Sequence, residues 1–306
     1  MTDSVSSPAR LPDFLLIGGM KCGSTSLHDQ LVTHPQLAEP QFKEPGFFSR
    51  DERFAHGMER YLTIFSEAAA DQLLFESSTC YTRHPHFGAV AQRIHEHLPD
   101  IKLVYIMRHP VDRLYSHYRH AMLEGAGHGE PVVSLEAALA SSEEYFDTGC
   151  YLRQIEQYTA FYPRDRFFFL TLEELKTDPD AVLGGLQRFL GIDVVEGLGS
   201  KKGPSNQIEA RATSSNASGL KERLQRNPVV RLIKQAVPVP VRARIMRAVM
   251  ESPIVRARMT AKTDAFMAQL SPLTDEMRAE LLARYEAPNR ALAEFLGRDL
   301  PDSWSS

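Results

Sequence analysis

Cysteine is scarce in this chain of 306 residues. Cys22, Cys80 and Cys150 lie far apart, and none of them belongs to a Cys-x-x-Cys pair. An odd and sparse set of this kind is poor material for a disulfide framework or a zinc site. We therefore expect a protein of a reducing compartment, the cytoplasm.

Long apolar runs and a basic excess are missing too. No run approaches the roughly 18 apolar residues that a transmembrane helix needs. The polar residues 1–11 indicate a disordered leader rather than a signal peptide. The 35 Lys and Arg stand against 39 Asp and Glu, for a formal charge of −4. This balance argues against a general nucleic-acid-binding protein, which carries a clear excess of basic residues.

What the chain does contain is an alternation of short apolar runs with stretches of helical spacing. The runs that predict buried strands are 14–17, 73–75, 101–107 and 166–172. The stretches that predict helices are 24–33, 86–97, 111–122, 150–161 and 179–190. Strands that alternate with helices form a parallel sheet covered on both faces. We expect an α/β fold of three layers, with ligands beyond the carboxyl ends of the strands.

The sequence pattern changes after about residue 204, where strand-like runs give way to a basic stretch of helical spacing. We expect 12–306 to form one domain, with a core of about 13–204, a basic helical region of about 205–274 and closing helices over 275–306. Residues 275–297 read as two amphipathic helices. Their core candidates are Leu281, Leu282, Leu292 and Phe295.

The basic region is densest over 214–262, where eleven Lys and Arg stand against two Glu, a local charge of +9. Three interpretations stay open: a solvated helical surface, a lid over an anionic acceptor, or a peripheral membrane contact that reaches a lipid-linked acceptor.

The turn after the first predicted strand has the composition of a phosphate-binding loop. Residues 18–27 read Gly-Gly-Met-Lys-Cys-Gly-Ser-Thr-Ser-Leu. Glycines let backbone N–H groups face an anion, and the start of a helix offers further N–H groups and the positive end of its dipole. Lys21 adds a full positive charge. The alternative is a strand–helix turn whose hydroxyl residues only cap the helix.

ATP fits this loop poorly. Gly18 and Gly23 have the separation of a Walker A loop, but Ser24 stands where the lysine belongs, and the lysine lies upstream at position 21. A P-loop kinase also needs a magnesium-binding aspartate after a later strand, whereas the run 103–107 ends in Arg108. A kinase remains an alternative that predicts dependence on ATP and Mg²⁺.

The run that ends in Arg108 continues with His-Pro, and Ser116 follows two turns into the next predicted helix. Pro110 suits the first turn of a helix. A guanidinium grips a phosphate through two parallel hydrogen bonds, and a serine adds another. The alternative interpretation is that Arg108 forms an ion pair with a carboxylate and that Ser116 is a surface residue without a ligand.

Together these motifs resemble the PAPS-dependent sulfotransferases, which use 3′-phosphoadenosine 5′-phosphosulfate (PAPS) and release 3′-phosphoadenosine 5′-phosphate (PAP). The loop at 21–25 is similar to the family's 5′-phosphosulfate loop, Lys-x-Gly-Ser/Thr-Thr/Ser, and Arg108 with Ser116 is similar to its 3′-phosphate site. The resemblance covers most of 13–191 and implies a P-loop-like fold without a metal. The donor contacts that it implies are Lys21, Cys22, Gly23, Ser24, Thr25, Ser26, Arg108, Ser116, Lys201, Lys202 and Gly203, with Lys262 as a rival to the last three.

The catalytic residues implied by the resemblance are Glu44 and Lys21. Residues 41–48 resemble the Lys-Glu-Pro-x-Phe-Phe segment of the heparan-sulfate branch, in which the glutamate is the proposed base. Phenylalanines around Glu44 would partly desolvate it, and Lys21 would stabilise the leaving phosphate. Three histidines near the motifs are held in reserve as alternative bases: His84, His109 and His117.

Two departures from that branch put a heparan-like acceptor in doubt. Ser77 stands where a lysine often follows Glu76, and Gly46 stands where some relatives carry a histidine. We therefore expect sulfuryl transfer to a hydroxyl, or an amine, of a carbohydrate, glycolipid or small natural product. The non-enzyme alternative is a nucleotide-binding module that binds PAP but transfers nothing.

Overall fold

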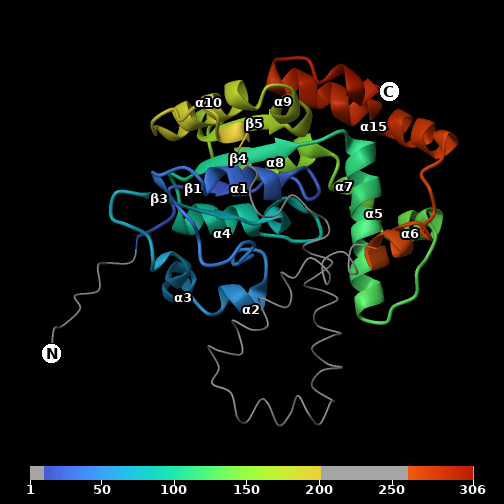
Figure 1. Cartoon of the computed structure of the whole chain (residues 1–306), viewed down its shortest axis with the longest axis horizontal. Helices are drawn as coiled ribbons and strands as arrows, with labels where there is room; N and C mark the ends of the chain where they lie inside the picture. The colour runs from blue at the N-terminus through green and yellow to red at the C-terminus, as the bar shows by residue number, and fades with distance from the viewer. Residues whose placement is uncertain (1–9, 201–260, 306) are drawn as a thin grey trace, which may run out of the picture. The chain divides into compact units, whose positions relative to one another are not determined.

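The computed structural model describes residues 10–200 and 261–305. Its sheet is parallel throughout, with the strand order β2-β3-β1-β4-β5 (Figure 1). The strands are β1 (Phe14–Leu16), β2 (Leu37–Ala38), β3 (Leu73–Ser77), β4 (Lys102–Met107) and β5 (Phe167–Thr171). The four predicted strands are confirmed. Strand β2 was missed because two residues are too few to show a pattern.

The helices are α1 (Ser24–Leu31), α2 (Asp51–Phe54), α3 (Met58–Leu62), α4 (Val90–His97), α5 (Pro110–Gly127), α6 (Leu135–Ser141), α7 (Glu144–Asp147), α8 (Tyr151–Thr159), α9 (Leu172–Thr177), α10 (Pro179–Leu190) and α15 (Asp275–Leu296). Short 3₁₀ turns are η1 (Thr63–Phe65), η2 (Thr79–Thr82), η3 (Arg164–Arg166), η4 (Leu198–Ser200) and η5 (Asp302–Ser305). The five predicted helices correspond to α1, α4, α5, α8 and α10.

Side-chain contacts show which helices cover which face of the sheet. On β5, the ring of Phe168 contacts Phe189 of α10, whereas the next residue, Phe169, contacts Phe295 of α15. Because successive side chains of a strand point to opposite faces, α10 and α15 lie on opposite sides of the sheet. Tyr105 of β4 pairs in register with Phe169 and contacts Tyr151 of α8, which places α8 on the α15 side. The predicted three-layer fold is confirmed.

Two compact units are present within the described residues. The first comprises 10–117, 142–200 and 274–305 and contains the whole sheet, and the second comprises 118–141 and 261–273. Residues 1–9 of the predicted leader lie outside the described residues. Arg10 already belongs to the fold, since its guanidinium donates to the carbonyls of Ala69, Ala70 and Gln72.

The closing segment forms one helix, α15, and not the two helices that we predicted over 275–297. The Thr274 hydroxyl accepts from the Met277 N–H at its start, and Gly297 ends it in a left-handed conformation with φ of 66°. Pro288 removes one backbone hydrogen bond inside the helix. Burial at regular spacing on both sides of the proline keeps the helix continuous. The buried residues are Leu281, Tyr285, Leu292 and Leu296.

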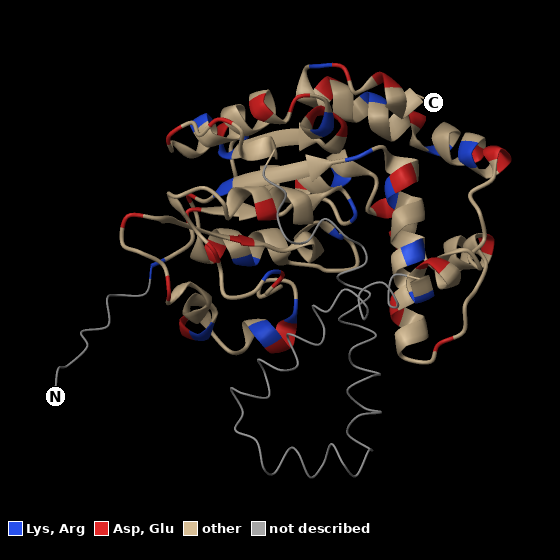
Figure 2. Cartoon of the chain, in the orientation of Figure 1, with Lys and Arg blue, Asp and Glu red and all other residues tan. Residues whose placement is uncertain are grey.

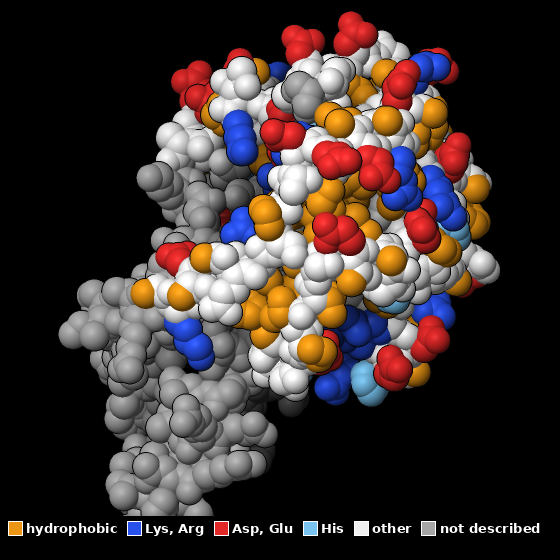
Figure 3. Space-filling model, turned by 90° about the vertical axis from the view of Figure 1, so that its right-hand side faces the viewer, with side chains coloured by type: hydrophobic (Ala, Val, Ile, Leu, Met, Phe, Trp, Pro, Cys, Tyr) orange, Lys and Arg blue, Asp and Glu red, His pale blue; other side chains and the backbone are white. Residues whose placement is uncertain are grey.

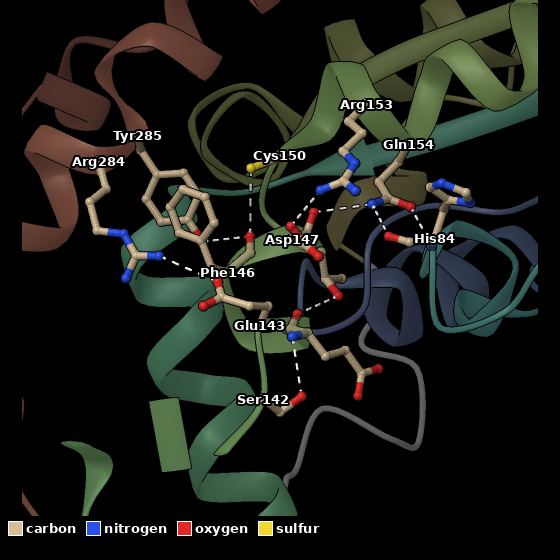
Figure 4. Close-up of polar contacts among 12 residues, drawn as sticks. His84, Ser142, Glu143, Phe146, Asp147, Cys150, Arg153, Gln154, Arg284 and Tyr285 are labelled. Carbon is tan, nitrogen blue, oxygen red and sulfur yellow. Dashed lines mark hydrogen bonds and ion pairs between the residues drawn. The ribbon is translucent and has the colours of Figure 1, made fainter. Parts of the chain in front are cut away.

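Figure 4 shows how α15 is attached to the core. The fully buried Tyr285 donates to the carbonyl of Phe146 over 2.9 Å and stacks on its ring, with 4.5 Å between ring centroids. The guanidinium of Arg284 lies 4.2 Å from the centre of the same ring. Beside this contact, the buried amide of Gln154 donates to the carbonyls of His84 and Asp147. These contacts fix the start of α8, which carries a residue of the site.

The surface outside the basic region is acidic on balance. The total charge of −4 and the local +9 over 214–262 leave −13 for the rest of the chain. On the face shown in Figure 3, acidic side chains are spread widely, with basic ones between them. Residues 214–260 lie outside the described residues, so the three interpretations of the basic region stay predictions.

Candidate active site

The two predicted phosphate loops follow neighbouring strands. Strands β1 and β4 pair in parallel, and beyond the end of β1 the backbone keeps to β4, because the N–H of Gly19 donates to the carbonyl of Ile106 over 2.9 Å. Gly18 makes this close approach, since a Cβ there would lie 2.4 Å from the Ile106 nitrogen. The loop at 18–27 therefore meets the end of β4, where Arg108 follows.

The first loop has the conformation of an anion-binding turn. Lys21 and Gly23 both have left-handed backbones, with φ of 68° and 92°. Gly23 is the N-cap of α1 and has no side chain to cap the helix. The first turn of α1, Ser24 to Leu27, contains hydroxyl groups and no acid, so it keeps its positive potential. This geometry favours anion binding over the alternative of a turn that is only capped.

Arg108 reaches across to this loop. Its guanidinium donates to the carbonyl of Lys21 over 3.4 Å. The hydroxyl of the buried Tyr151 donates to the Arg108 carbonyl over 2.6 Å and lies 3.4 Å from the Cys22 sulfur. Tyr151 therefore joins both loops from α8. Sequence reasoning missed it, because only the fold brings α8 to this point.

The side chain of Cys22 is fully buried, and the backbone N–H of this residue donates to the carbonyl of Gly19 within the loop over 3.1 Å. Burial raises the pKa of its thiol to about 11, against the smaller opposing effect of the Tyr151 hydroxyl. A thiol of this kind stays protonated at neutral pH and is a poor nucleophile. Its side chain fills the space beside Gly19, where an added Cβ would lie 2.7 Å from the sulfur.

The first turns of α5 lie beside Arg108. Asp112 is 3.9 Å from its guanidinium and 2.7 Å from that of Arg278. Burial opposes ionisation of Asp112, but the Arg278 hydrogen bond and the charges of His109, Arg278 and Arg108 together lower its pKa. The alternative, in which Arg108 pairs with a carboxylate, is thus met in part by Asp112, and the Arg108 side chain is still 26% exposed. Ser116 lies four residues after Asp112 and so on the same helix face.

Glu44 stands in a loop that is pinned to β3. Its N–H donates to the carbonyl of Ser77 over 2.9 Å, and the Thr79 hydroxyl donates to its carboxylate over 3.2 Å. The Lys43 ammonium lies 3.5 Å from the same carboxylate and donates to the Thr25 hydroxyl over 2.7 Å. Lys43 therefore links the candidate base to the first phosphate loop. Its place directly before Glu44 was the only signal in the sequence.

The Lys21 loop and the Glu44 loop both contain a strained backbone conformation. Among the described residues, positive φ values outside glycine occur at Lys21, Glu44 and Ala89. Such a conformation costs about 1–3 kcal/mol and persists where the surroundings enforce it, often at functional sites. Two of the three residues are the predicted catalytic residues.

Residues 76–78, where the sequence departs from the heparan-sulfate branch, contact both α1 and the loop that carries Glu44. Ser77, which replaces the lysine, lies with its hydroxyl 2.7 Å from the ring nitrogen Nδ1 of His28 in α1. The Ser78 hydroxyl accepts from the N–H of Gly46 over 2.9 Å. Burial raises the pKa of Glu76 to about 8; the nearby hydroxyls of Tyr81 and Ser78 oppose the shift, and the Glu44 charge adds to it.

The histidines held in reserve occupy structural positions. The ring nitrogen Nδ1 of His109 accepts from the Asp112 N–H at the start of α5, and the backbone N–H of His109 donates to the Glu173 carboxylate. The ring of His117 packs on Tyr145, with centroids 4.6 Å apart. The backbone of His84 is bound by Gln154.

Some predicted residues cannot be placed at the site. Lys201, Lys202 and Gly203 lie outside the described residues, and the exposed Lys262 belongs to the second unit. Within the described ranges, no group of three or more His, Cys, Asp or Glu is placed to hold a metal ion. None of the described helices combines the length and the apolarity needed to span a bilayer.

Comparison with known proteins identifies the family. A model described as "Sulfotransferase domain" matches residues 11–222. The chain belongs to the sulfotransferase family. The PAPS-dependent family predicted from the two motifs is thereby confirmed, and with it the interpretation of the chain as an enzyme.

Curated relatives of this sulfotransferase include two bifunctional heparan sulfate N-deacetylase/N-sulfotransferases. Form 2 from Homo sapiens is 30% identical over 207 residues, and form 1 from Caenorhabditis elegans is 28% identical over 199 residues. Each match covers 60% of this chain and 22% of the relative, so the chain spans about a fifth of their length. A solved sulfotransferase from Alicyclobacillus acidocaldarius shares the fold, with a TM-score of 0.64, 21% identity and coverage of 97% of this chain and 100% of that chain.

Proposed function

We propose that this sulfotransferase moves a sulfuryl group from PAPS to a hydroxyl, or an amine, of a carbohydrate, glycolipid or small natural product. The observation that carries the proposal is the contact between Arg108 and the Lys21 loop. PAPS has phosphate at both its 3′ and 5′ positions. Two cationic loops that touch suit a nucleotide with two separated anionic ends.

The loops divide the donor between them. The N–H groups and hydroxyls at the start of α1, together with Lys21, suit the 5′-phosphosulfate. Arg108 and Ser116 suit the 3′-phosphate, which distinguishes PAPS from ATP. No carboxylate follows β4 where a kinase needs one for magnesium, since the strand ends at Met107 and Arg108 comes next. This supports a sulfuryl donor over the kinase alternative.

The transfer itself is an in-line displacement at sulfur. The acceptor oxygen or nitrogen forms a bond to sulfur while the bond from sulfur to the 5′-phosphate oxygen breaks, and PAP leaves. Glu44 takes the acceptor's proton, and Lys21 offsets the charge on the departing phosphate. Lys43 and Thr79 hold the Glu44 carboxylate in one orientation. These roles use residues of this chain and no metal.

The cellular setting is a further part of the proposal. Cys22, Cys80 and Cys150 are all free and buried thiols, which supports a reducing compartment such as the cytoplasm. A peripheral membrane contact through residues 214–262 would bring the enzyme to a lipid-linked acceptor. Binding to anionic vesicles by a chain with and without charge reversal in that region tests this contact.

Calorimetric titration tests the donor assignment. We expect PAP to bind far more tightly than ATP, and ³⁵S from labelled PAPS to appear on components of a cell extract. Binding of PAP without any transfer would indicate the inactive nucleotide-binding module. Preference for ATP would contradict the proposal.

A further inference from the structure

A pocket of about 360 Å³ has Glu44 among its lining residues. The loop at 42–47 forms one side, and α2, α3 and η1 form the other. The basic and aromatic residues of its lining are Phe42, Arg53, His56, Arg60 and Tyr61. None of these residues belongs to the phosphate loops, so the lining of the pocket is separate from the proposed donor site.

The walls of this pocket are held in place by packing. The rings of Phe47 and Tyr61 stack with centroids 4.7 Å apart, and both side chains are buried. The Arg53 guanidinium donates to the carbonyls of Pro45 and Glu44, so it braces the loop that carries the base. Phe42, by contrast, is 54% exposed. An apolar ring in the pocket would cover it.

The charge of the pocket is positive on balance. Arg53, Arg60 and His56 line it, whereas Glu44 is its single acidic residue and already interacts with Lys43. Helices α2 and α3 also carry acids (Figure 2), but Glu52 and Glu59 are not part of the lining. Of the side chains described here, none makes a hydrogen bond or ion pair with that of Arg60 or His56.

We propose that this pocket selects an acceptor that carries an anionic group, such as a carboxylate, on a single ring. The ring lies against Phe42 and Tyr61, the anion is bound by Arg60 with His56, and the nucleophile faces Glu44. A guanidinium binds a carboxylate through two parallel hydrogen bonds. A volume of about 360 Å³ is at the small end for ligand pockets. It suits one ring rather than several sugars of a polysaccharide.

This inference rests on the proposed function, because Glu44 must be the base for the pocket to hold the acceptor. The anionic ring can come from an aromatic acid or from a sugar acid. Two matched pairs of probes separate these sources: 4-hydroxyphenylacetate with its amide, and methyl glucuronide with methyl glucoside. Each is titrated into protein saturated with PAP, so that binding is measured without chemistry.

We expect the acid of at least one pair to bind with an affinity at least tenfold higher than that of its neutral partner. Arg60→Ala should reduce this preference to less than threefold. Arg188→Ala, which removes an exposed arginine of α10 far from the pocket in sequence, should leave it unchanged. Phe42→Ala should weaken the binding of the acid and of the neutral probe equally. Since Phe42, Arg60 and Arg188 are exposed, all three variants should keep the wild-type melting temperature.

The inference is overturned if neither acid is preferred, or if the preference survives in Arg60→Ala. That outcome leaves the donor assignment standing as long as PAP binds. If PAP does not bind, the proposed function falls instead. The titrations of the four probes are then repeated in the absence of PAP, because the charge of the pocket does not depend on the donor.

Discussion

The guanidinium of Arg108 donates a hydrogen bond to the main-chain carbonyl of Lys21 over 3.4 Å. These residues follow two different strands and lie 87 positions apart in the sequence. Their contact means that the sites proposed for the 3′-phosphate and for the 5′-phosphosulfate share a wall. One bound nucleotide can then interact with both loops without any rearrangement of the sheet.

Replacing Lys21 by alanine should lower turnover by about a thousandfold or more, because the charge on the leaving phosphate then lacks its nearest cation. The rate of ³⁵S transfer from PAPS measures this. Lys176→Ala, on the exposed surface of α9, is the matched control and should keep the wild-type rate. Wild-type turnover in Lys21→Ala would remove Lys21 from the mechanism.

Replacing Glu44 by glutamine should lower turnover by two to four orders of magnitude, the usual contribution of a general base. The change keeps the size of the side chain and its contact with Thr79, so the affinity for PAP should stay near that of the wild type. Single-turnover transfer and calorimetry measure the two quantities separately. A collapse of PAP affinity would show that Glu44 belongs to the donor site instead.

Replacing Arg108 by alanine should weaken PAP binding by about tenfold to a hundredfold, the equivalent of one charge-assisted hydrogen-bonded pair. Adenosine 5′-phosphosulfate, which lacks the 3′-phosphate, provides the internal control and should bind the variant as it binds the wild type. Equal losses for both nucleotides would mean that Arg108 supports the loop but does not read the 3′-phosphate.

Replacing Tyr151 by phenylalanine removes the hydroxyl that joins Cys22 to Arg108. We expect a loss of about 1 kcal/mol in the free energy of unfolding together with weaker PAP binding. Tyr158→Phe is the matched control, since its buried hydroxyl donates to the Tyr81 carbonyl over 2.8 Å away from both loops. The control should lose similar stability but keep its affinity for PAP. Equal PAP affinities in the two variants would contradict the role of Tyr151.

The fold was largely predictable because the strands that matter are buried on both faces and therefore read as continuous apolar runs. Strand β4 is the clearest case, with Leu103 to Met107 all buried. The closing helix was less predictable, since Pro288 disrupts the pattern of a helix that burial nevertheless keeps continuous.

The site was predictable where it is local in sequence. Lys21 and Arg108 belong to short motifs that follow strands β1 and β4. Their chemistry and their position at the edge of the sheet could therefore both be predicted. Tyr151 and Lys43 could not be found in this way, because their roles consist of contacts with distant residues. Lys43 reaches Thr25, and Tyr151 reaches Cys22 from 129 positions away.

Glu76 should make the stability of the protein depend on pH. Burial raises its pKa to about 8 in the folded state, whereas an unfolded glutamate titrates near 4.3. Between these values the folded state holds a proton that the unfolded state has released. Stability should therefore be fully present below about pH 4.3 and decline as pH rises towards 8, by up to roughly 1.4 kcal/mol per pH unit from this group.

The variant that tests this is Glu76→Gln, which keeps the shape of the protonated carboxyl but cannot ionise. Urea unfolding from pH 5 to 8 should show a steeper fall in the wild type than in the variant. Glu196→Gln, at an exposed position, should follow the wild type. Because the Glu44 charge adds to the shift at Glu76, the decline in Glu44→Gln should end at a lower pH but should still be present. Parallel curves for the wild type and Glu76→Gln would mean that Glu76 is ionised in the folded protein, and that a charged group lies beneath the proposed base.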